Sequence, residues 1–286
     1  MKSKKISLVL SSGGARGIAH LGVIDVLEEN GFQISSIVGC SMGALVGGMY
    51  AAGNYQALKE WLFALNKKKI VSLIDADVNT SYVVRGDVLI KNMMKTMPDC
   101  LIENCKIPFS AVASNVKDEK EVVFVKGSLY EAIRASISIP IFFKPIQTQH
   151  QLLMDGAVLN PFPLNYAQKN DGELLVAVNV TAFSNAQFPP HLSRSKNEEI
   201  HPKRQWHFPK NTFFIKGAFL HQEAETVIQL LLASNSKLMS RLYPCDLQLD
   251  LPASSFHCFD FLKAREIYET GRNLMQMRIA DLEKLV

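Results

Sequence analysis

The chain has 286 residues, of which 48% are hydrophobic and 20% are charged, and its formal net charge is +4. This composition can build a sizeable core and excludes an intrinsically disordered chain. The charge is too small to indicate a nucleic-acid partner, and we expect none. The five cysteines are scattered and lack metal-ligand spacing, so we expect reduced thiols, no metal and no cofactor.

The start of the chain is basic, but it lacks the features of a secretory signal. Only about six apolar residues precede the polar Ser11 and Ser12, fewer than a signal peptide requires. No run reaches the ~18 apolar residues that span a bilayer. We therefore expect a single domain over residues 1–286 in the cytoplasm, with peripheral contact at the inner membrane face left open. The sequence does not give the oligomeric state.

Two strand–loop–helix units open the chain. The first has an apolar strand over residues 6–10, a glycine-rich loop over 11–17 and a helix over 18–30. The second has an apolar strand over 34–38 and a helix of small residues over 44–52. Such units favour a parallel α/β sheet. Ligands bind at the carboxyl ends of the strands in such sheets, so both loops are candidate sites.

The second loop, Gly39-Cys40-Ser41-Met42-Gly43, is a G-x-S-x-G pattern. In a nucleophile elbow this pattern places the serine on a sharp, strained turn between a strand and a helix. Glycines at both ends allow the strand and the helix to approach closely, and the helix N-terminus directs N–H groups toward the serine. A glycine-rich turn with only a packing role can have the same sequence pattern, so the motif alone leaves both interpretations open.

The first loop, with Gly13 and Gly14 ahead of a helix, offers consecutive unhindered N–H groups, which can bind an anion. Its spacing matches neither the dinucleotide-binding nor the P-loop pattern. A tight turn, an oxyanion site and a phosphate site all remain open. If the two strands are neighbours, Gly13 and Gly14 lie opposite Ser41.

The middle of the chain supplies a candidate base. Residues 54–107 are predicted to be mainly helical, 109–125 to form a hairpin and 128–136 a helix. An apolar strand then ends at Asp155, and a buried strand follows over 173–180. An acid at the end of an apolar strand can serve as a base, because desolvation raises the pKa of a carboxyl. An aspartate that only forms a turn before a glycine would have the same sequence, so this alternative stays open.

Residues 184–216 differ in composition, with six Lys or Arg, two Glu, four Pro and interleaved aromatic residues. We interpret this segment either as a basic loop or as a lid or patch that contacts anionic lipid, where each basic residue adds about 1 kcal/mol. Two long helices are predicted after it, over 218–242 and 259–285, and would flank the sheet.

A nucleophilic serine needs a base, and the histidines do not supply a good candidate. None of the six that follow Ser41 lies in a strand-end loop with small neighbours. His20 falls inside the first predicted helix, where we expect it to pack. The remaining candidate is Asp155, acting directly on the serine in a Ser-Asp dyad.

Three segments, over residues 12–17, 39–43 and 155–157, together resemble the bacterial branch of the patatin-like phospholipase family. Residues 134–140 and the predicted helix around 260–264 also look like this family, and the resemblance covers residues 5–182 and 225–275. It implies a three-layer α/β/α sandwich with a mainly parallel sheet. It also implies a serine hydrolase that cleaves acyl esters of lipids, of phospholipase, lysophospholipase or esterase type.

The resemblance also implies roles for individual residues. Ser41 would be the nucleophile that forms an acyl-enzyme, and Asp155 would be the base. Further residues would support the motifs around them, namely Gly39, Gly43 and Gly156. The oxyanion hole would be formed by backbone N–H groups, each worth roughly 3 kcal/mol, from Gly13, Gly14 and Ala15. Arg16 would support that loop or meet an anionic headgroup.

Three positions depart from the family pattern: Ser12 and Ala157 stand where glycine is usual, and Cys40 where threonine is usual. We expect Cys40 to be an inert buried side chain, although its place beside the nucleophile leaves regulation by oxidation or alkylation open. Two other classes of function stay in view. One is a non-catalytic lipid- or acyl-binding regulator, and the other is a nucleotide-binding module that uses the glycine loop.

Overall fold

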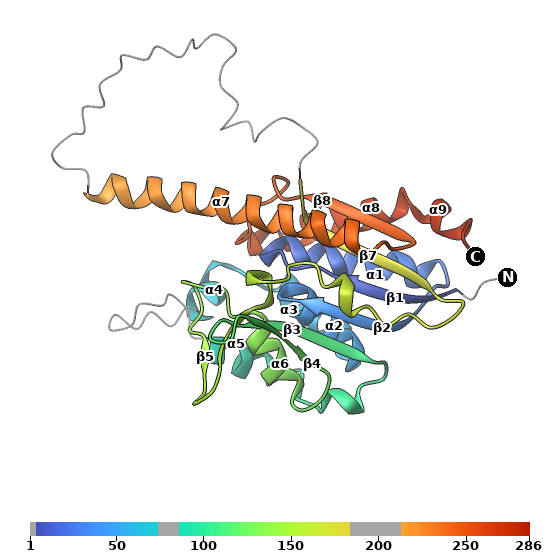
Figure 1. Cartoon of the computed structure of the whole chain (residues 1–286), viewed down its shortest axis with the longest axis horizontal. Coiled ribbons are helices and arrows are strands. Elements are labelled where there is room, and N and C mark those ends of the chain that lie inside the picture. Colours follow the sequence, from blue (N-terminus) through green and yellow to red (C-terminus); the bar gives the residue numbers. More distant parts are fainter. Residues whose placement is uncertain (1–3, 74–85, 184–212) are drawn as a thin grey trace, which may run out of the picture.

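The computed structural model describes residues 4–73, 86–183 and 213–286. Within them, an eight-stranded sheet has the order β5-β6-β3-β2-β1-β7-β8, with β4 paired to β3 (Figure 1). The strands are β1 (Lys5–Leu10), β2 (Gln33–Cys40), β3 (Phe109–Asn115), β4 (Lys120–Phe124), β5 (Ile146–Gln147), β6 (Leu152–Asp155), β7 (Leu174–Ala182) and β8 (Leu247–Pro252). The α-helices are α1 (Ala19–Glu29), α2 (Met42–Ala51), α3 (Tyr55–Phe63), α4 (Lys67–Leu73), α5 (Gly86–Met93), α6 (Leu129–Ser136), α7 (Phe213–Leu242), α8 (Ala264–Gln276) and α9 (Ile279–Glu283). Short 3₁₀ turns are η1 (Gly14–Ile18), η2 (Ile102–Asn104), η3 (Gly156–Val158), η4 (Leu164–Tyr166) and η5 (Phe261–Lys263).

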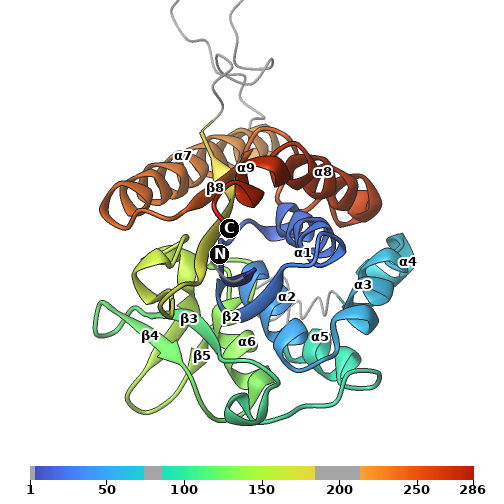
Figure 2. The same ribbon diagram turned by 90° about the vertical axis from the view of Figure 1, so that its right-hand side faces the viewer.

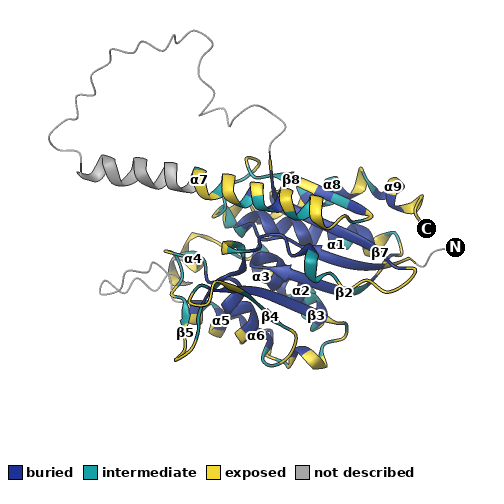
Figure 3. Ribbon diagram, viewed as in Figure 1, coloured by how far each residue is buried: buried dark blue, intermediate teal, exposed yellow. Residues whose placement is uncertain are grey.

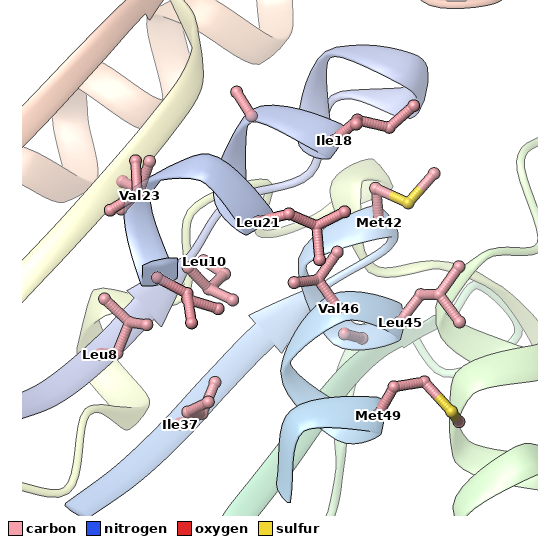
Figure 4. Packing of buried hydrophobic residues seen from close by; sticks show 14 of the residues in the cluster. Leu8, Leu10, Ile18, Leu21, Val23, Ile37, Met42, Leu45, Val46 and Met49 are labelled. Atoms are coloured by element: carbon pink, nitrogen blue, oxygen red, sulfur yellow. The ribbon is translucent and has the colours of Figure 1, made fainter. Parts of the chain in front are cut away.

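The sheet is mainly parallel and covered by helices on both faces, as predicted (Figure 2). Strands covered on both sides must be apolar on both sides, which explains their continuous apolar runs. Leu8 and Leu10 of β1 pack with Leu21 of α1 and Val46 of α2 in the larger core (Figure 4). Val9, which points the other way, belongs to a second cluster on the opposite face. The three-layer α/β/α prediction is therefore confirmed.

The helices divide unequally between the two faces. Residues of α1, α2, α3, α6 and α8 share the larger core, whereas α7 and the segment around η4 lie over the opposite face. Buried residues accordingly concentrate in the strands and in the first two helices (Figure 3). None of the helices in the described ranges is long and apolar enough to cross a membrane.

Two helix predictions need correction. The helix predicted over 218–242 begins earlier, at Phe213. The single helix predicted over 259–285 is instead η5, α8 and α9, with a break at Met277 and Arg278. The break escapes notice because the apolar spacing of Met275, Ile279 and Leu282, all of them buried, continues across it. Residues 74–85 of the region predicted as helical, and residues 184–212 of the basic segment, lie outside the described residues.

Candidate active site

The turn between β2 and α2 consists of a single residue, Ser41. Its backbone has φ 54° and ψ −119°, a conformation that costs a non-glycine residue on the order of 1–3 kcal/mol. The glycines on either side permit this turn. A Cβ on Gly39 would lie 2.4 Å from the backbone of Gly43, and a Cβ on Gly43 would lie 2.3 Å from the carbonyl oxygen of Leu10. The strand and the helix therefore approach as a nucleophile elbow requires.

Strand pairing brings the serine and the aspartate together. One edge of β3 pairs with β4, while the other pairs first with β2, Cys40 opposite Val112, and then with β6, Asp155 opposite Ala113. Because β2 is parallel and β6 antiparallel to β3, the two strands run toward each other along this edge. Their ends abut, so Ser41 meets Asp155. The acid thus lies at a strand end, as predicted, but on an antiparallel strand.

The two side chains are in direct contact. Ser41 Oγ lies 2.5 Å from Asp155 Oδ2, and Asp155 Oδ1 accepts a hydrogen bond from the Ala157 N–H at 2.8 Å. Both residues are buried, with 3% and 2% of their surface exposed. Burial raises the pKa of Asp155 to about 7, even though the hydrogen bonds from Ser41, Ala157 and Cys40 act to lower it. The carboxyl can therefore take up a proton near neutral pH.

Cys40 lies next to the carboxyl group of Asp155. Its Sγ is 3.9 Å from Asp155 Oδ1, and the side chain is fully buried. Burial, together with the nearby charges of Asp155 and Glu121, raises the pKa of the thiol well above its usual value. Since the thiolate is the reactive form, this environment favours the interpretation of Cys40 as an inert side chain over a redox role.

The glycine loop lies beside the elbow because β1 and β2 are neighbours, with Leu10 opposite Gly39. The two loops touch, since a Cβ on Gly17 would lie 2.4 Å from the side chain of Met42. Gly14 has φ +58°, and a Cβ there would lie 2.4 Å from the carbonyl oxygen of Cys258. Only glycine fits this position without displacing the loop.

The structure corrects one member of the predicted oxyanion hole. The Ala15 N–H donates a hydrogen bond to the Cys258 carbonyl at 2.8 Å, so it is not free to bind an oxyanion. By contrast, the N–H groups of Gly13 and Gly14 find no acceptor among the residues that the structure describes. The donors left at the tip of the loop are therefore these two.

Two side chains fix the orientation of these glycine N–H groups. Ser11 Oγ donates to the Ser12 carbonyl at 2.9 Å, and Arg16 Nε donates to the Gly13 carbonyl at 3.2 Å. In a trans peptide the carbonyl and the next N–H point in opposite directions. The N–H groups of Gly13 and Gly14 are thus directed away from Ser11 and Arg16, respectively.

Arg16 is buried, with 1% of its surface exposed. Its Nη1 donates to the carbonyl of Ala253 at 2.7 Å and lies 3.5 Å from that of Phe256. These contacts join the glycine loop to the segment after β8. Of the two predicted roles, they match support of the loop, because a buried guanidinium does not present itself to a headgroup.

His20 packs beneath the same loop, as predicted, and makes a contact that the sequence does not show. Its Nε2 lies 3.0 Å from the Ser11 carbonyl, and burial lowers the pKa of the imidazole to about 4. The ring is therefore neutral at physiological pH and supports the peptide that precedes the glycines. It has no contact with Ser41 that would make it a base.

Sequence reasoning also missed Ser136, whose Oγ accepts a hydrogen bond from the Ser41 N–H at 2.8 Å. The available signal was its position within residues 134–140, which resemble the family. No comparable signal marks the carbonyls of Ala253, Phe256 and Cys258. Over the parts of the chain that are described, no three His, Cys, Asp or Glu side chains are grouped as metal ligands would be.

The sequence of this chain is similar to those of known proteins. A family model described as "Patatin-like phospholipase" matches residues 8–167, more than half of the chain. An uncharacterised NTE family protein of Mycobacterium tuberculosis is 38% identical over 178 residues, which are 62% of this chain and 49% of that protein. Lysophospholipase NTE1 of Saccharomyces cerevisiae is 28% identical over 281 residues, covering 95% of this chain and 16% of that protein.

The fold also has a solved counterpart. The crystal structure of VipD from Legionella pneumophila superposes with a TM-score of 0.53 at 15% identity, covering 97% of this chain and 67% of that one. This likeness concerns the fold alone, and the chain spans half or less of the sequence relatives named above. The match of the family model, over the residues that carry the elbow, the glycine loop and the aspartate, establishes that the chain belongs to the patatin-like phospholipase family.

Proposed function

We propose that this chain is a serine hydrolase that cleaves acyl ester bonds of lipids through a Ser-Asp dyad. The observation that carries the proposal is the 2.5 Å contact between Ser41 Oγ and Asp155 Oδ2 at a strained elbow. The substrate class is supported by the family description and by the yeast relative, which is named a lysophospholipase. Phospholipase, lysophospholipase and simple esterase activity are the forms to be distinguished by assay.

Acylation uses the groups already in contact. The Ser41 hydroxyl proton moves to Asp155 Oδ2 while Oγ attacks the ester carbonyl carbon. The N–H groups of Gly13 and Gly14 stabilise the negative charge that develops on the carbonyl oxygen, a contribution of roughly 3 kcal/mol per donor. The N-terminus of α2 adds a favourable dipole. The ester C–O bond then breaks, and the leaving alkoxide takes the proton from Asp155.

Deacylation repeats these steps with water in place of the serine hydroxyl and with Ser41 as the leaving group. Asp155, again ionised, removes a proton from water, and the hydroxide attacks the acyl carbon. The tetrahedral intermediate then collapses, and the bond between the acyl carbon and the Ser41 oxygen breaks. The Ser41 oxygen takes the proton back from Asp155, and the fatty acid is released. All protons and electron pairs are accounted for by the substrate, water and the dyad, so the proposal includes no cofactor.

A fluorophosphonate probe tests the proposed function on the wild-type protein. Ser41 Oγ should displace fluoride and carry the phosphonyl group, which mass spectrometry of the peptide that contains Ser41 detects. The labelled protein should lose hydrolysis of lysophosphatidylcholine and of a p-nitrophenyl ester in the same proportion. An unlabelled protein that still binds fatty acid would instead be the non-catalytic regulator. A thermal shift with ATP, GTP or NAD would indicate the nucleotide-binding alternative.

We also infer that the protein contacts anionic membranes, and the described part of α7 offers a surface for this. Residues 226–242 contain Lys237 and Arg241 but no Asp or Glu. Lipid-facing helices combine such basic residues with an exposed apolar stripe. Four α7 side chains at helical spacing are more than half exposed, namely Val227, Leu231, Leu238 and Leu242. The helix also contacts the segment that follows Asp155, because Asn235 Nδ2 donates a hydrogen bond to the Leu159 carbonyl at 2.8 Å.

Replacing Leu231 and Leu238 together with aspartate should weaken binding to phosphatidylglycerol-containing vesicles by about tenfold or more. Each change removes on the order of 1.5 kcal/mol of apolar burial and adds a repelled charge. Vesicle sedimentation at low and high salt measures the effect. Met277→Asp, at an even more exposed apolar position between α8 and α9, is the control and should bind like the wild type. Equal loss in both proteins, or in neither, contradicts the role of α7.

A further inference from the structure

The hydroxyl group of Ser136 stands between the nucleophile and the neighbouring strand. Ser136 is the last residue of α6 and is completely buried. Its Oγ donates to the Val112 carbonyl at 2.6 Å and lies 2.8 Å from the backbone nitrogen of Ser41. A hydroxyl has one hydrogen, which here goes to Val112, so Ser136 must accept the Ser41 N–H.

This hydroxyl occupies the place of a strand-to-strand hydrogen bond. Cys40 and Val112 are the last pair of the β2–β3 ladder. In a parallel ladder the bonds slant, so a carbonyl accepts from the residue that follows its partner, which for Val112 is Ser41. Ser136 Oγ is inserted between these two groups. The insertion satisfies both while keeping the Ser41 backbone apart from β3, where the chain turns into α2.

The position of Ser136 is fixed by the rest of α6. The helix starts with a side-chain cap, since Ser128 Oγ accepts from the Glu131 N–H at 3.1 Å. Two residues before its end, Arg134 donates hydrogen bonds to Asp87 Oδ1 at 2.9 Å and to the Lys144 carbonyl at 2.9 Å. Because hydrogen bonds fix this end of α6, the Ser136 hydroxyl can hold the elbow in a defined position.

The same helix end also reaches the aspartate. The Asp155 N–H donates to the carbonyl of Ser138 at 2.9 Å, two residues beyond Ser136. One short segment therefore holds the backbone of both residues whose side chains meet. The separation of Ser41 Oγ and Asp155 Oδ2 depends on this segment as well as on the sheet.

We propose that Ser136 is a positioning residue, which holds Ser41 in the strained elbow through the N–H of the nucleophile. The proposal rests on the proposed function and adds to it a residue that touches neither substrate nor the reacting oxygen. It also means that the Ser41 N–H is occupied and is not an oxyanion donor. Without the hydroxyl, the Ser41 N–H can close directly on the Val112 carbonyl, which draws the nucleophile out of line with Asp155.

The test compares Ser136→Ala with Ser136→Thr and Ser7→Ala. Threonine keeps the hydroxyl. Ser7 is the matched control, because it is equally buried and its Oγ also makes a hydrogen bond, with Ser36 Oγ at 3.0 Å. It lies near the amino end of β1, away from the site. Each protein is assayed for melting temperature, for kcat and KM with a p-nitrophenyl ester, and for the rate of fluorophosphonate labelling.

For Ser136→Ala we expect kcat and the labelling rate to fall by about 10- to 100-fold with KM little changed, because misplacement of a reacting group by about 1 Å has effects of this size. Ser136→Thr should recover most of the loss, and Ser7→Ala should stay within about twofold of the wild type while melting lower. If Ser136→Ala loses no more activity than Ser7→Ala, or if threonine restores stability without activity, the positioning role is wrong. A wild-type protein that is neither active nor labelled would instead overturn the proposed function, which separates the two failures.

Discussion

Replacing Ser41 with alanine is expected to lower kcat for ester hydrolysis by about 10⁴-fold or more, the scale seen when a hydrolase loses its nucleophile. The variant lacks the oxygen that attacks the carbonyl, whereas the glycine N–H groups and the remaining surface are unchanged. Substrate binding should therefore persist. Turnover of lysophosphatidylcholine and a p-nitrophenyl ester measures the first effect, and equilibrium binding of fatty acid measures the second.

The backbone of Ser41 provides a control that separates activity from stability. Glycine accepts φ 54° without the penalty that alanine retains. Ser41→Gly should thus be as inactive as Ser41→Ala but more stable by on the order of 1 kcal/mol. Ser72→Ala, at an exposed serine of α4, should keep full activity. Wild-type turnover in Ser41→Ala would remove this serine from the mechanism, whatever its geometry.

The local pattern of the sequence was sufficient for the central features of the fold. Apolar runs bounded by glycine gave the first strands and helices, and their order implied that β1 and β2 could be neighbours. With β1 and β2 as neighbours, Gly13 and Gly14 are expected to lie near Ser41, and the register of Leu10 with Gly39 agrees with that arrangement. Such features are predictable because short-range periodicity and turn chemistry determine them.

The features that could not be predicted depend on long-range contacts. The direction of β6 follows from its pairing with β3, and no residue of 152–155 encodes it alone. The loss of Ala15 as a donor depends on the backbone carbonyl of Cys258, and a carbonyl is present at every position of the chain. Ser136 differs from these, because its side chain is specific, but its role depends on where α6 ends relative to the elbow. Tertiary structure alone brings these groups together.

Replacing Asp155 with asparagine is expected to abolish turnover and, at alkaline pH, to stabilise the protein. The amide cannot take the Ser41 proton, so kcat should fall by about 10³-fold or more. The wild-type rate should rise with pH through about 7, since burial raises the pKa of Asp155 to about 7 and only the ionised carboxylate is a base. The variant should show no such rise. A pH–rate profile over pH 5–9 measures both expectations.

The stability effect follows from the direction of the same pKa shift. The pKa of Asp155 is about 7 in the folded protein, against 3.8 for an aspartate side chain in water. Between these values the folded state binds a proton that the unfolded chain has released, so the free energy of unfolding falls as pH rises across this interval. Above pH 7 the whole penalty is present, on the order of a few kcal/mol at about 1.4 kcal/mol per pKa unit. Asparagine carries no charge and avoids it.

Thermal melts at pH 5 and pH 8 test this, with Asp25→Asn as the matched control. Burial acts to raise the pKa of Asp25, but hydrogen bonds from Lys59, Tyr268 and Tyr55 outweigh it and lower that pKa. Its carboxylate thus stabilises the fold above its unfolded pKa, and Asp25→Asn should melt lower than the wild type at pH 8. Asp155→Asn should melt higher at pH 8, with a smaller difference at pH 5. An Asp155→Asn protein that melts lower at pH 8 would mean that the ionised carboxylate is compensated in the folded state, and the dyad would then lack the raised pKa that its chemistry near neutral pH uses.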